Sequence, residues 1–178
     1  MPATIRNALL TDIPALEVLI PDSVRTLQAG YYTTEQMEGA LGTVFGVDTQ
    51  LIRDGTYFVA EADSVIVGCG GWSRRKTLFG SDNVPQKDDA WLNPERDAAR
   101  IRAFLIHPAW VRRGIGSQIL ETCEAAARAE GFSRFELVAT LPGEPMYRAR
   151  GFLAVERFEV PLPNGASLPV VKMIKQVR

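Results

Sequence analysis

The most regular pattern of apolar and polar positions lies between residues 101 and 131. Residues 101–107 are mostly apolar on both faces, as expected of a central β-strand, and Pro108 ends the stretch because proline cannot donate to a strand ladder. Residues 114–130 then repeat apolar side chains at helical spacing, and Gly131 occupies the position of a left-handed C-cap. The pattern predicts a buried strand, a short turn and an amphipathic helix.

The remaining pattern predicts an α/β protein built on one mixed sheet. Further strands are predicted at residues 4–8, 56–62, 65–72, 134–139, 152–160 and 167–176. One helix is predicted to begin at Thr11 or Asp12, and a second is predicted to follow Pro21 and to end at Gly30. A third is predicted to begin at a capping box formed by Thr33 and Gln36. We therefore expect about seven strands, mostly antiparallel, and about four helices in a single domain spanning residues 1–178.

The turn before the long helix contains Gly114 and Gly116 and is a candidate anion site. Unpaired backbone N–H groups and the positive end of the helix dipole both favour a negative ligand at a helix N-terminus. An ordinary tight turn would explain the two glycines equally well. The sequence lacks the lysine motif of a P-loop, and Ile119 stands where a dinucleotide-binding fingerprint needs its third glycine.

Composition narrows the class of protein further. With 178 residues and a net charge of −1, the chain lacks the charge excess typical of proteins that bind nucleic acid or anionic membranes. No apolar run approaches the roughly 20 residues that span a bilayer, and the first residues do not resemble a secretory signal. Cys69 and Cys123 lie in apolar stretches and are expected to be buried free thiols, and together with the single His they form no metal-binding pattern. We expect a cytoplasmic protein without a metal.

Two motifs of the chain resemble those of a known family. Residues 104–108, followed by the Gly114 to Gly116 turn, resemble motif A of the GCN5-related N-acetyltransferases, the GNAT superfamily. Tyr147, followed four residues later by Gly151 and Phe152, resembles motif B of the same family. Both motifs occur in the family's order and spacing, so the resemblance covers residues 99–155.

The resemblance implies a GNAT-like fold in which strands 4 and 5 splay apart to admit acetyl-CoA. Strand-4 backbone groups would hold the pantetheine and the glycine turn would hold the pyrophosphate. Val111 stands where the family usually has Gln or Arg, while its neighbours keep the positive charge. The residues expected to bind acetyl-CoA are Phe104, Leu105, Ile106, Arg112, Arg113, Gly114, Ile115, Gly116, Ser117 and Thr140.

Acetyl transfer by direct attack of an amine needs a base for the ammonium and an acid for the departing thiolate. By resemblance Tyr147 is the candidate acid, because a phenol suits a thiolate leaving group; packing in a helix is the alternative. Glu136 matches a strand-5 glutamate of the ribosomal N-terminal acetyltransferases and is the candidate base, with ion pairing to Arg134 or a neighbouring strand as the alternative. His107 directly precedes Pro108, a place without a catalytic role in the family.

Two further stretches are candidates for the acceptor side. Tyr31 and Tyr32 lie where families of this type place loop residues beside the acceptor pocket, although paired rings also pack as ordinary core. Residues 73–98 form a long irregular connection, and such a connection inside a domain is commonly either a functional lid or a disordered loop. We expect this loop to cover part of the acceptor cleft.

Three functions fit these observations. The first is an acyltransferase, namely an acetyl-CoA-dependent N-acetyltransferase that acts on a small-molecule or peptide amine. A homodimer is compatible with this function. The second is a non-catalytic acyl-CoA-binding or sensing domain of the same fold. The third is a nucleotide-phosphate-binding module that shares only the glycine turn. Tyr147 favours the first function over the second.

Overall fold

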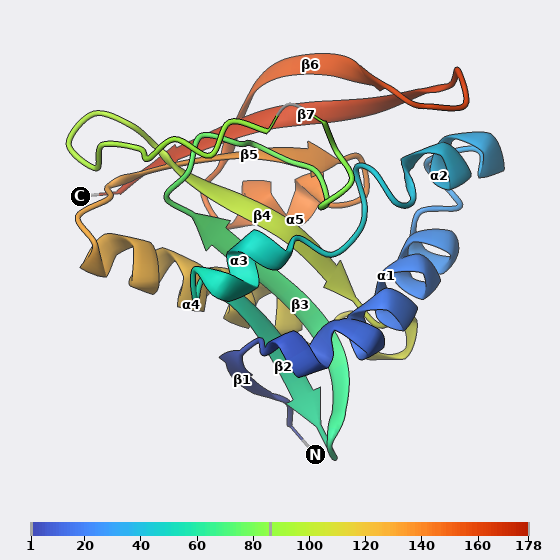
Figure 1. Ribbon diagram of the computed structural model, residues 1–178, viewed down its shortest axis with the longest axis horizontal. Coiled ribbons are helices and arrows are strands. Elements are labelled where there is room, and N and C mark those ends of the chain that lie inside the picture. Colours follow the sequence, from blue (N-terminus) through green and yellow to red (C-terminus); the bar gives the residue numbers. More distant parts are fainter. Residues whose placement is uncertain (1, 86, 178) are drawn as a thin grey trace.

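The computed structural model describes residues 2–85 and 87–177, and its centre is one mixed seven-stranded sheet (Figure 1). The strands are β1 (Thr4–Asn7), β2 (Tyr57–Ala62), β3 (Val65–Ser73), β4 (Ala99–Ile106), β5 (Arg134–Thr140), β6 (Leu153–Pro161) and β7 (Ser167–Gln176). They lie in the order β1-β2-β3-β4-β5-β7-β6, and all neighbours are antiparallel except β4 and β5, which are parallel. The predicted fold class is confirmed.

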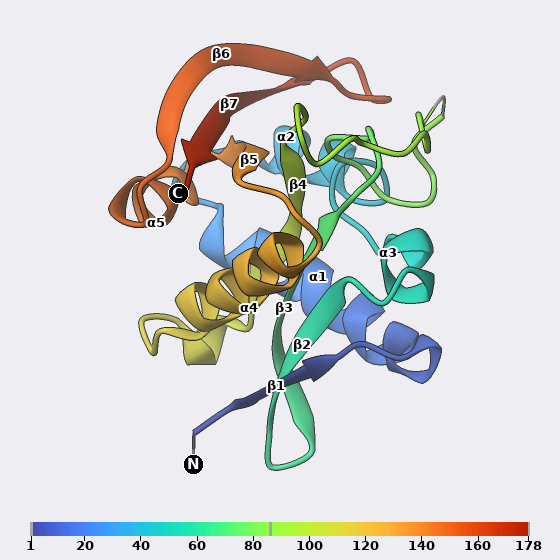
Figure 2. The ribbon, with the colours of Figure 1, turned by 90° about the vertical axis from the view of Figure 1, so that its left-hand side faces the viewer.

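Helices cover both faces of this sheet. They are η1 (Leu10–Asp12), α1 (Ile13–Leu27), α2 (Thr34–Ala40), α3 (Thr49–Arg53), η2 (Pro108–Trp110), α4 (Ile115–Ala129) and α5 (Glu144–Ala149). Figure 2 shows α4 on one side of β3, and α1 and α3 on the other side. One buried cluster includes the inner side of α4, and a second includes the inner sides of α1 and α2. No helix among the described residues is both long and apolar enough to cross a membrane.

The helix after the glycine turn has the predicted amphipathic form. Ile115, Ile119, Cys123 and Ala127 are buried along one side of α4. Gly131 follows the helix with a φ of 96°, the left-handed conformation that glycine adopts without a Cβ penalty. The apolar pattern therefore predicts the buried side and the end of this helix correctly.

The first helix differs from the prediction at Pro21. The sequence predicts a new helical stretch there, but α1 runs through this proline as one helix. A proline inside a helix removes one N–H donor. Leu16, Ile20 and Val24 are nevertheless buried on the same side of α1, so the packing of that side outweighs the lost hydrogen bond.

Side chains define the starts of the two short helices α2 and α3. Thr33 and Gln36 form the predicted capping box of α2. Asp48 begins α3 by accepting a hydrogen bond from the N–H of Gln50 at 3.1 Å. The sequence pattern does not predict α3, and the described residues contain five α-helices rather than about four.

The sheet opens between β4 and β5. In the described part of the chain these strands are paired only at Ala99–Phe135 and Arg100–Glu136, whereas β5 stays paired with β7 over its whole length. β4 also bulges at Ala103, whose φ of 58° lies in the left-handed region. The splaying of strands 4 and 5 is confirmed, and it leaves one edge of β4 without a strand partner.

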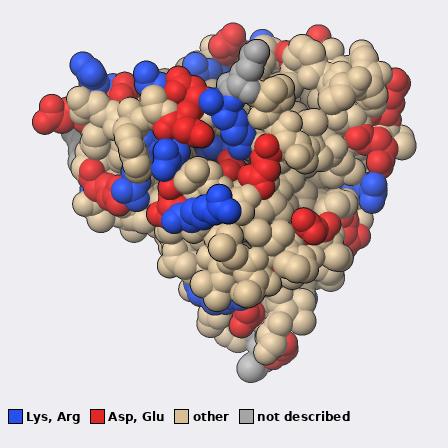
Figure 3. All heavy atoms as spheres, viewed as in Figure 1, with Lys and Arg blue, Asp and Glu red and all other residues tan. Residues whose placement is uncertain are grey.

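The connection between β3 and β4 is irregular, as predicted. Its described residues, 74–85 and 87–98, contain no helix or strand apart from an isolated bridge between Arg75 and Trp91. Over this connection, on the face shown in Figure 3, Lys and Arg side chains lie beside Asp and Glu side chains. Ion pairs such as Arg75–Asp54 (2.7 Å) account for part of this mixture, and the face shows no broad area of a single charge.

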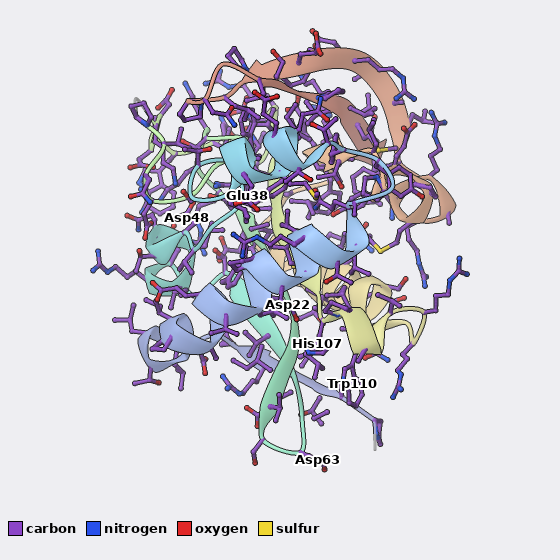
Figure 4. The ribbon with its side chains drawn as sticks, turned by 90° about the vertical axis from the view of Figure 1, so that its right-hand side faces the viewer. Asp22, Glu38, Asp48, Asp63, His107 and Trp110 are labelled. Carbon is purple, nitrogen blue, oxygen red and sulfur yellow. The ribbon has the colours of Figure 1, made fainter. Side chains whose placement is uncertain are left out.

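Arg102 of β4 anchors the connection to the sheet. Its guanidinium donates hydrogen bonds to the carbonyl oxygens of Thr77 (3.3 Å) and Gly80 (2.8 Å). It also forms an ion pair with Asp48 (2.7 Å), and Nζ of Lys87 lies 2.9 Å from the same carboxylate oxygen. Figure 4 shows Asp48 at the start of α3. One buried carboxylate therefore joins α3, β4 and the loop.

Candidate active site

A cavity of about 650 Å³ occupies the opening between β4 and β5. Residues 101–106 of β4 and 138–140 of β5 form its middle, and the first turn of α4 lies at one end. Its other end is bounded by the last turn of α1 and by residues 44–46 and 78–80. Because α4 and α1 lie on opposite faces of the sheet (Figure 2), the cavity passes through the sheet at the strand opening.

The N-terminus of α4 forms the polar end of the cavity. Gly114 has a φ of 78°, and no side chain caps the helix. The N–H of Gln118 bonds to the carbonyl oxygen of Gly114 at 3.0 Å, so the N–H groups of residues 115–117 precede the first intrahelical bond and lack a helical acceptor. Nothing lies within 4 Å of the position that a Cβ would take on Gly114. Free N–H groups and the helix dipole make this end suitable for an anion.

The two arginines before this turn have different surroundings. Arg112 lines the cavity. Arg113 is not among the lining residues, and its guanidinium lies over the indole of Trp110, 4.4 Å from the ring centroid. In the same turn (Figure 4), Nδ1 of His107 accepts a hydrogen bond from the N–H of Ala109 at 3.0 Å. Arg112 is therefore placed to meet an anion, whereas Arg113 and His107 contact the turn itself.

Gly116 lies where α4 meets α5. A Cβ added to this glycine would lie 2.9 Å from Sδ of Met146, which is closer than such atoms normally approach. Glycine at this position therefore lets the two helices approach each other at the cavity wall. Its first neighbour is a protein side chain, so space for a phosphate is not the only reason for the glycine.

The bulge in β4 shapes the middle of the cavity. The carbonyl oxygen of Ala103 accepts a hydrogen bond from the hydroxyl of Tyr57 at 2.9 Å. Gly70 of β3 faces the ring of Phe104, and a Cβ there would lie 2.6 Å from the ring atom Cδ1. Phe104, Leu105 and Ile106 all line the cavity. Because β4 has no strand partner here, backbone N–H and C=O groups along its free edge are left to bond a ligand.

Tyr147 lies in α5 at the cavity wall. Its ring packs edge-on against Phe104 and Phe152, with centroids 6.0 Å and 5.7 Å apart. Burial raises the pKa of the phenol above its ordinary value, so the hydroxyl stays protonated around neutral pH. Among the described residues this hydroxyl has no hydrogen-bond partner. Tyr147 can therefore act as a neutral proton donor to a ligand.

Three other predicted binding residues also line the cavity, namely Ile115, Ser117 and Thr140. Oγ of Ser117 accepts a hydrogen bond from Nε of Arg150 at 3.1 Å. Oγ1 of Thr140 accepts one from the N–H of Gly143 at 3.2 Å. Both hydroxyl groups keep their own hydrogen available for a ligand.

Glu136 lies outside the cavity lining. One of its carboxylate oxygens is 2.5 Å from Nη1 of Arg100, and the other is 2.7 Å from Nζ of Lys172. Both oxygens therefore contact cations of the neighbouring strands, which is the alternative that the sequence left open. Among the described residues that line the cavity there is no carboxylate.

The tyrosine pair is divided between the cavity and the core. Tyr31 is 56% exposed and lines the cavity near the end of α1. Tyr32 is buried, and its hydroxyl donates to the carbonyl oxygen of Pro169 (2.6 Å) and accepts from the N–H of Leu141 (2.9 Å). Residues 78–80 of the long connection line the same end as Tyr31.

Sequence reasoning misses Gln28, Arg102 and Asp48. Arg102 carries a usable signal, because an arginine inside an otherwise apolar strand needs a buried partner. Gln28 follows α1, is 5% exposed and lines the cavity, but a single glutamine after a helix has no distinctive pattern. Asp48 resembles any other helix cap in the sequence.

The described residues form a mixed sheet that opens between β4 and β5, with a cavity at the opening that reaches the N-terminus of α4. The model of the acetyltransferase (GNAT) family matches residues 22–152, well over half of the chain, and the protein belongs to this family. A comparison with curated proteins found no match. The described residues contain no group of three or more His, Cys, Asp or Glu that could hold a metal ion.

Solved structures share the fold. A GCN5-related N-acetyltransferase from Rhodopseudomonas palustris aligns at 21% identity with a TM-score of 0.73, over 99% of this chain and 97% of that chain. The PaiA N-acetyltransferase of Thermoplasma acidophilum, in complex with coenzyme A, aligns at 16% identity and a TM-score of 0.65, over 99% of both chains. YncA of Salmonella typhimurium, with its cofactor acetyl-CoA, aligns at 17% identity and a TM-score of 0.65, over 100% of this chain and 95% of that chain.

Proposed function

We propose that the protein transfers an acetyl group from acetyl-CoA to a primary amine, which attacks the thioester directly. The main support is the single cavity that joins the free N–H groups of α4 to an apolar end beside α1. Such a passage lets a phosphate-bearing donor enter from one face of the sheet and an acceptor from the other. A domain that only senses acyl-CoA would need the α4 end of the cavity and no acceptor end.

The residues at the α4 end fit acetyl-CoA. The N–H groups of residues 115–117 and the guanidinium of Arg112 would bind phosphate oxygens. The free edge of β4 near residues 104–106 would bond the amides of the pantetheine. When bound, acetyl-CoA supplies the activated acetyl group, and the chain binds and orients it.

Tyr147 would serve as the acid. The amine nitrogen forms a bond to the thioester carbon, the carbon–sulfur bond breaks, and the sulfur takes the proton of the Tyr147 hydroxyl. The nitrogen loses its proton to water, and the phenol regains one from water. Since the described lining residues include no Asp, Glu, His or Lys, the amine needs to reach the thioester with its lone pair free.

The decisive test is a screen of primary amines for thiol release from acetyl-CoA. Calorimetry with acetyl-CoA alone provides a separate measurement of binding. Thiol release that depends on an amine would support the proposal. Binding without release from any amine would favour the non-catalytic acyl-CoA-binding alternative.

The pH profile of kcat/KM is expected to follow the pKa of the amine itself. Below that pKa the amine is protonated, so kcat/KM should fall about tenfold per pH unit. Above it, kcat/KM should level off, because burial keeps the pKa of Tyr147 high and the acid protonated. The check is to compare two amines of clearly different pKa. A break at the same pH for both amines would contradict the prediction and indicate a base on the protein.

Glu136→Gln tests directly whether Glu136 is the base that takes the proton from the amine. The amide keeps the shape of the side chain beside Arg100 and Lys172. If water takes the proton, kcat should stay within about threefold of the unaltered protein. A loss of about 100-fold in a folded variant would restore Glu136 as the base.

Arg112→Ala is expected to weaken acetyl-CoA binding about three- to fivefold, because its charge faces the phosphates at a solvent-exposed position. Arg113→Ala is the matched control, and its effect should be smaller since that guanidinium lies over Trp110. Calorimetry with acetyl-CoA and with a pantetheine fragment checks both variants. Equal losses for the two ligands would mean that Arg112 does not act through the phosphates.

A further inference from the structure

The end of the cavity beside α1 is lined mainly by apolar side chains. They come from α1, from residues 44–46, from the connection before β4 and from β6 and β7, and they include Leu27, Val44, Phe45, Phe79, Val160 and Val170. No Asp, Glu, His or Lys is among the described residues that line the cavity. A ligand at this end therefore meets mostly hydrocarbon and no anion.

Two arginines line the cavity, but neither offers a free charge at this end. The side chain of Arg102 is 3% exposed, and its guanidinium contacts Asp48 at 2.7 Å and the carbonyl oxygen of Gly80 at 2.8 Å. Arg112 belongs to the turn before α4, at the opposite end. The apolar end consequently provides no counter-charge for a carboxylate.

One polar group at this end lacks a partner. Gln28 lines the cavity and is only 5% exposed. Its carboxamide oxygen is buried without a hydrogen-bond donor among the described residues. Buried polar groups nearly always have a partner, because an unpaired one has lost its bonds to water. Rotation about the last side-chain bond, which has a broad energy minimum, can turn this oxygen toward a ligand.

We propose that the acceptor is a primary monoamine with an apolar body, and that the Gln28 carboxamide accepts a hydrogen bond from its amino group. This inference rests on the acetyltransferase function proposed above. The apolar body would pack against the side chains of this end, and one N–H would bond to Gln28. A second ammonium group or a carboxylate would meet no free opposite charge on the described side chains of this end, which disfavours such acceptors.

Matched pairs of amines test the chemical class. Pentylamine and 1,5-diaminopentane have the same chain and differ by one ammonium group, and phenethylamine and phenylalanine differ by one carboxylate. We expect kcat/KM for each monoamine to exceed that of its charged counterpart at least about tenfold. Equal or reversed preference in either pair would overturn the inference while leaving the acetyltransferase function intact.

Gln28→Leu tests the role of the carboxamide. The variant should raise KM for the preferred monoamine about tenfold, with a smaller change in kcat, while calorimetric acetyl-CoA affinity stays within about twofold. Gln176→Leu is the matched control: Gln176 is exposed near the end of β7 and is not a lining residue. An unchanged KM in Gln28→Leu would overturn the assignment of Gln28.

Gln28→Glu provides a second variant with a pH profile as its readout. The new carboxylate would lie beside the reacting nitrogen and stabilise the protonated amine, so the pH at which kcat for pentylamine levels off should rise by about one unit or more. An unchanged pH profile in the folded variant would show that residue 28 does not face the amino group. If none of the four amines releases thiol while another amine of the screen does, this inference fails and the acetyltransferase function stands; if no amine of the screen releases thiol although acetyl-CoA binds, both fail.

Discussion

Tyr147→Phe is expected to lower kcat about 100-fold and to leave the affinity for acetyl-CoA within about threefold. Under the proposed mechanism the hydroxyl contributes only when the sulfur departs, whereas the ring contacts with Phe104 and Phe152 remain in the variant. A group that acts in the transition state lowers the rate without lowering ground-state binding. Steady-state kinetics with the best amine, together with calorimetry of acetyl-CoA, measures both quantities.

Tyr32→Phe is the control for this experiment. Its hydroxyl bonds to Pro169 and Leu141 and lies outside the cavity lining. Removing it should lower the Tm and change kcat little, whereas Tyr147→Phe should keep its Tm, because the Tyr147 hydroxyl has no partner among the described residues. An unchanged kcat in a folded Tyr147→Phe would leave Tyr147 a packing residue and assign the acid to water.

Asp48→Asn is expected to lower the free energy of unfolding by about 3–5 kcal/mol. The side chains of Asp48 and Arg102 are 4% and 3% exposed, so the variant would leave a buried guanidinium without its opposite charge. Burial lowers the pKa of Arg102, and the charge of Asp48 opposes that shift. The neutral amide retains the shape of the side chain, so the loss measures the charge rather than a cavity.

Chemical denaturation of the unaltered protein and of Asp48→Asn measures the difference in their free energies of unfolding. Glu38→Gln serves as the control, since it neutralises one partner of the exposed Arg25–Glu38 pair and should change stability little. Figure 4 shows Glu38 on α2 and Asp48 at the start of α3. Similar decreases in the free energy of unfolding for Asp48→Asn and Glu38→Gln would contradict the prediction. The ion pair of Asp48 would then contribute no more than an exposed pair.

The sequence was sufficient for the parts of the fold that short-range rules govern. Pro108, Gly114 and Gly131 mark the end of β4 and the two ends of α4, because proline and glycine restrict or free the backbone at their own positions. The same local rule failed at Pro21, where the buried side of α1 outweighs one missing donor. The presence of one proline in the sequence does not show how strongly the rest of the helix packs against the core.

The part of the site that the backbone forms is predictable from the sequence. The part where side chains from distant segments meet is much less predictable. The turn before α4 is predictable because Gly114 and Gly116 lie close together in the sequence, on either side of Ile115. Glu136 alternates with apolar residues like any strand residue, and only the neighbouring strands show that Arg100 and Lys172 occupy its carboxylate. Gln28 lines a cavity with residues as distant as Val170, so its unpaired oxygen could not be foreseen.

The division of the cavity into a backbone end and a side-chain end bears on how such a protein can evolve. The end at α4 presents N–H groups that every residue except proline carries, so many substitutions near the start of α4, other than at Gly114 and Gly116, preserve them. The end beside α1 is formed by side chains from several separate segments, including residues 44–46 and 78–80. Under the proposed function, substitutions in those segments can change the preferred amine while the donor site persists. The choice of amine is then the more rapidly evolving property, and use of acetyl-CoA the inherited one.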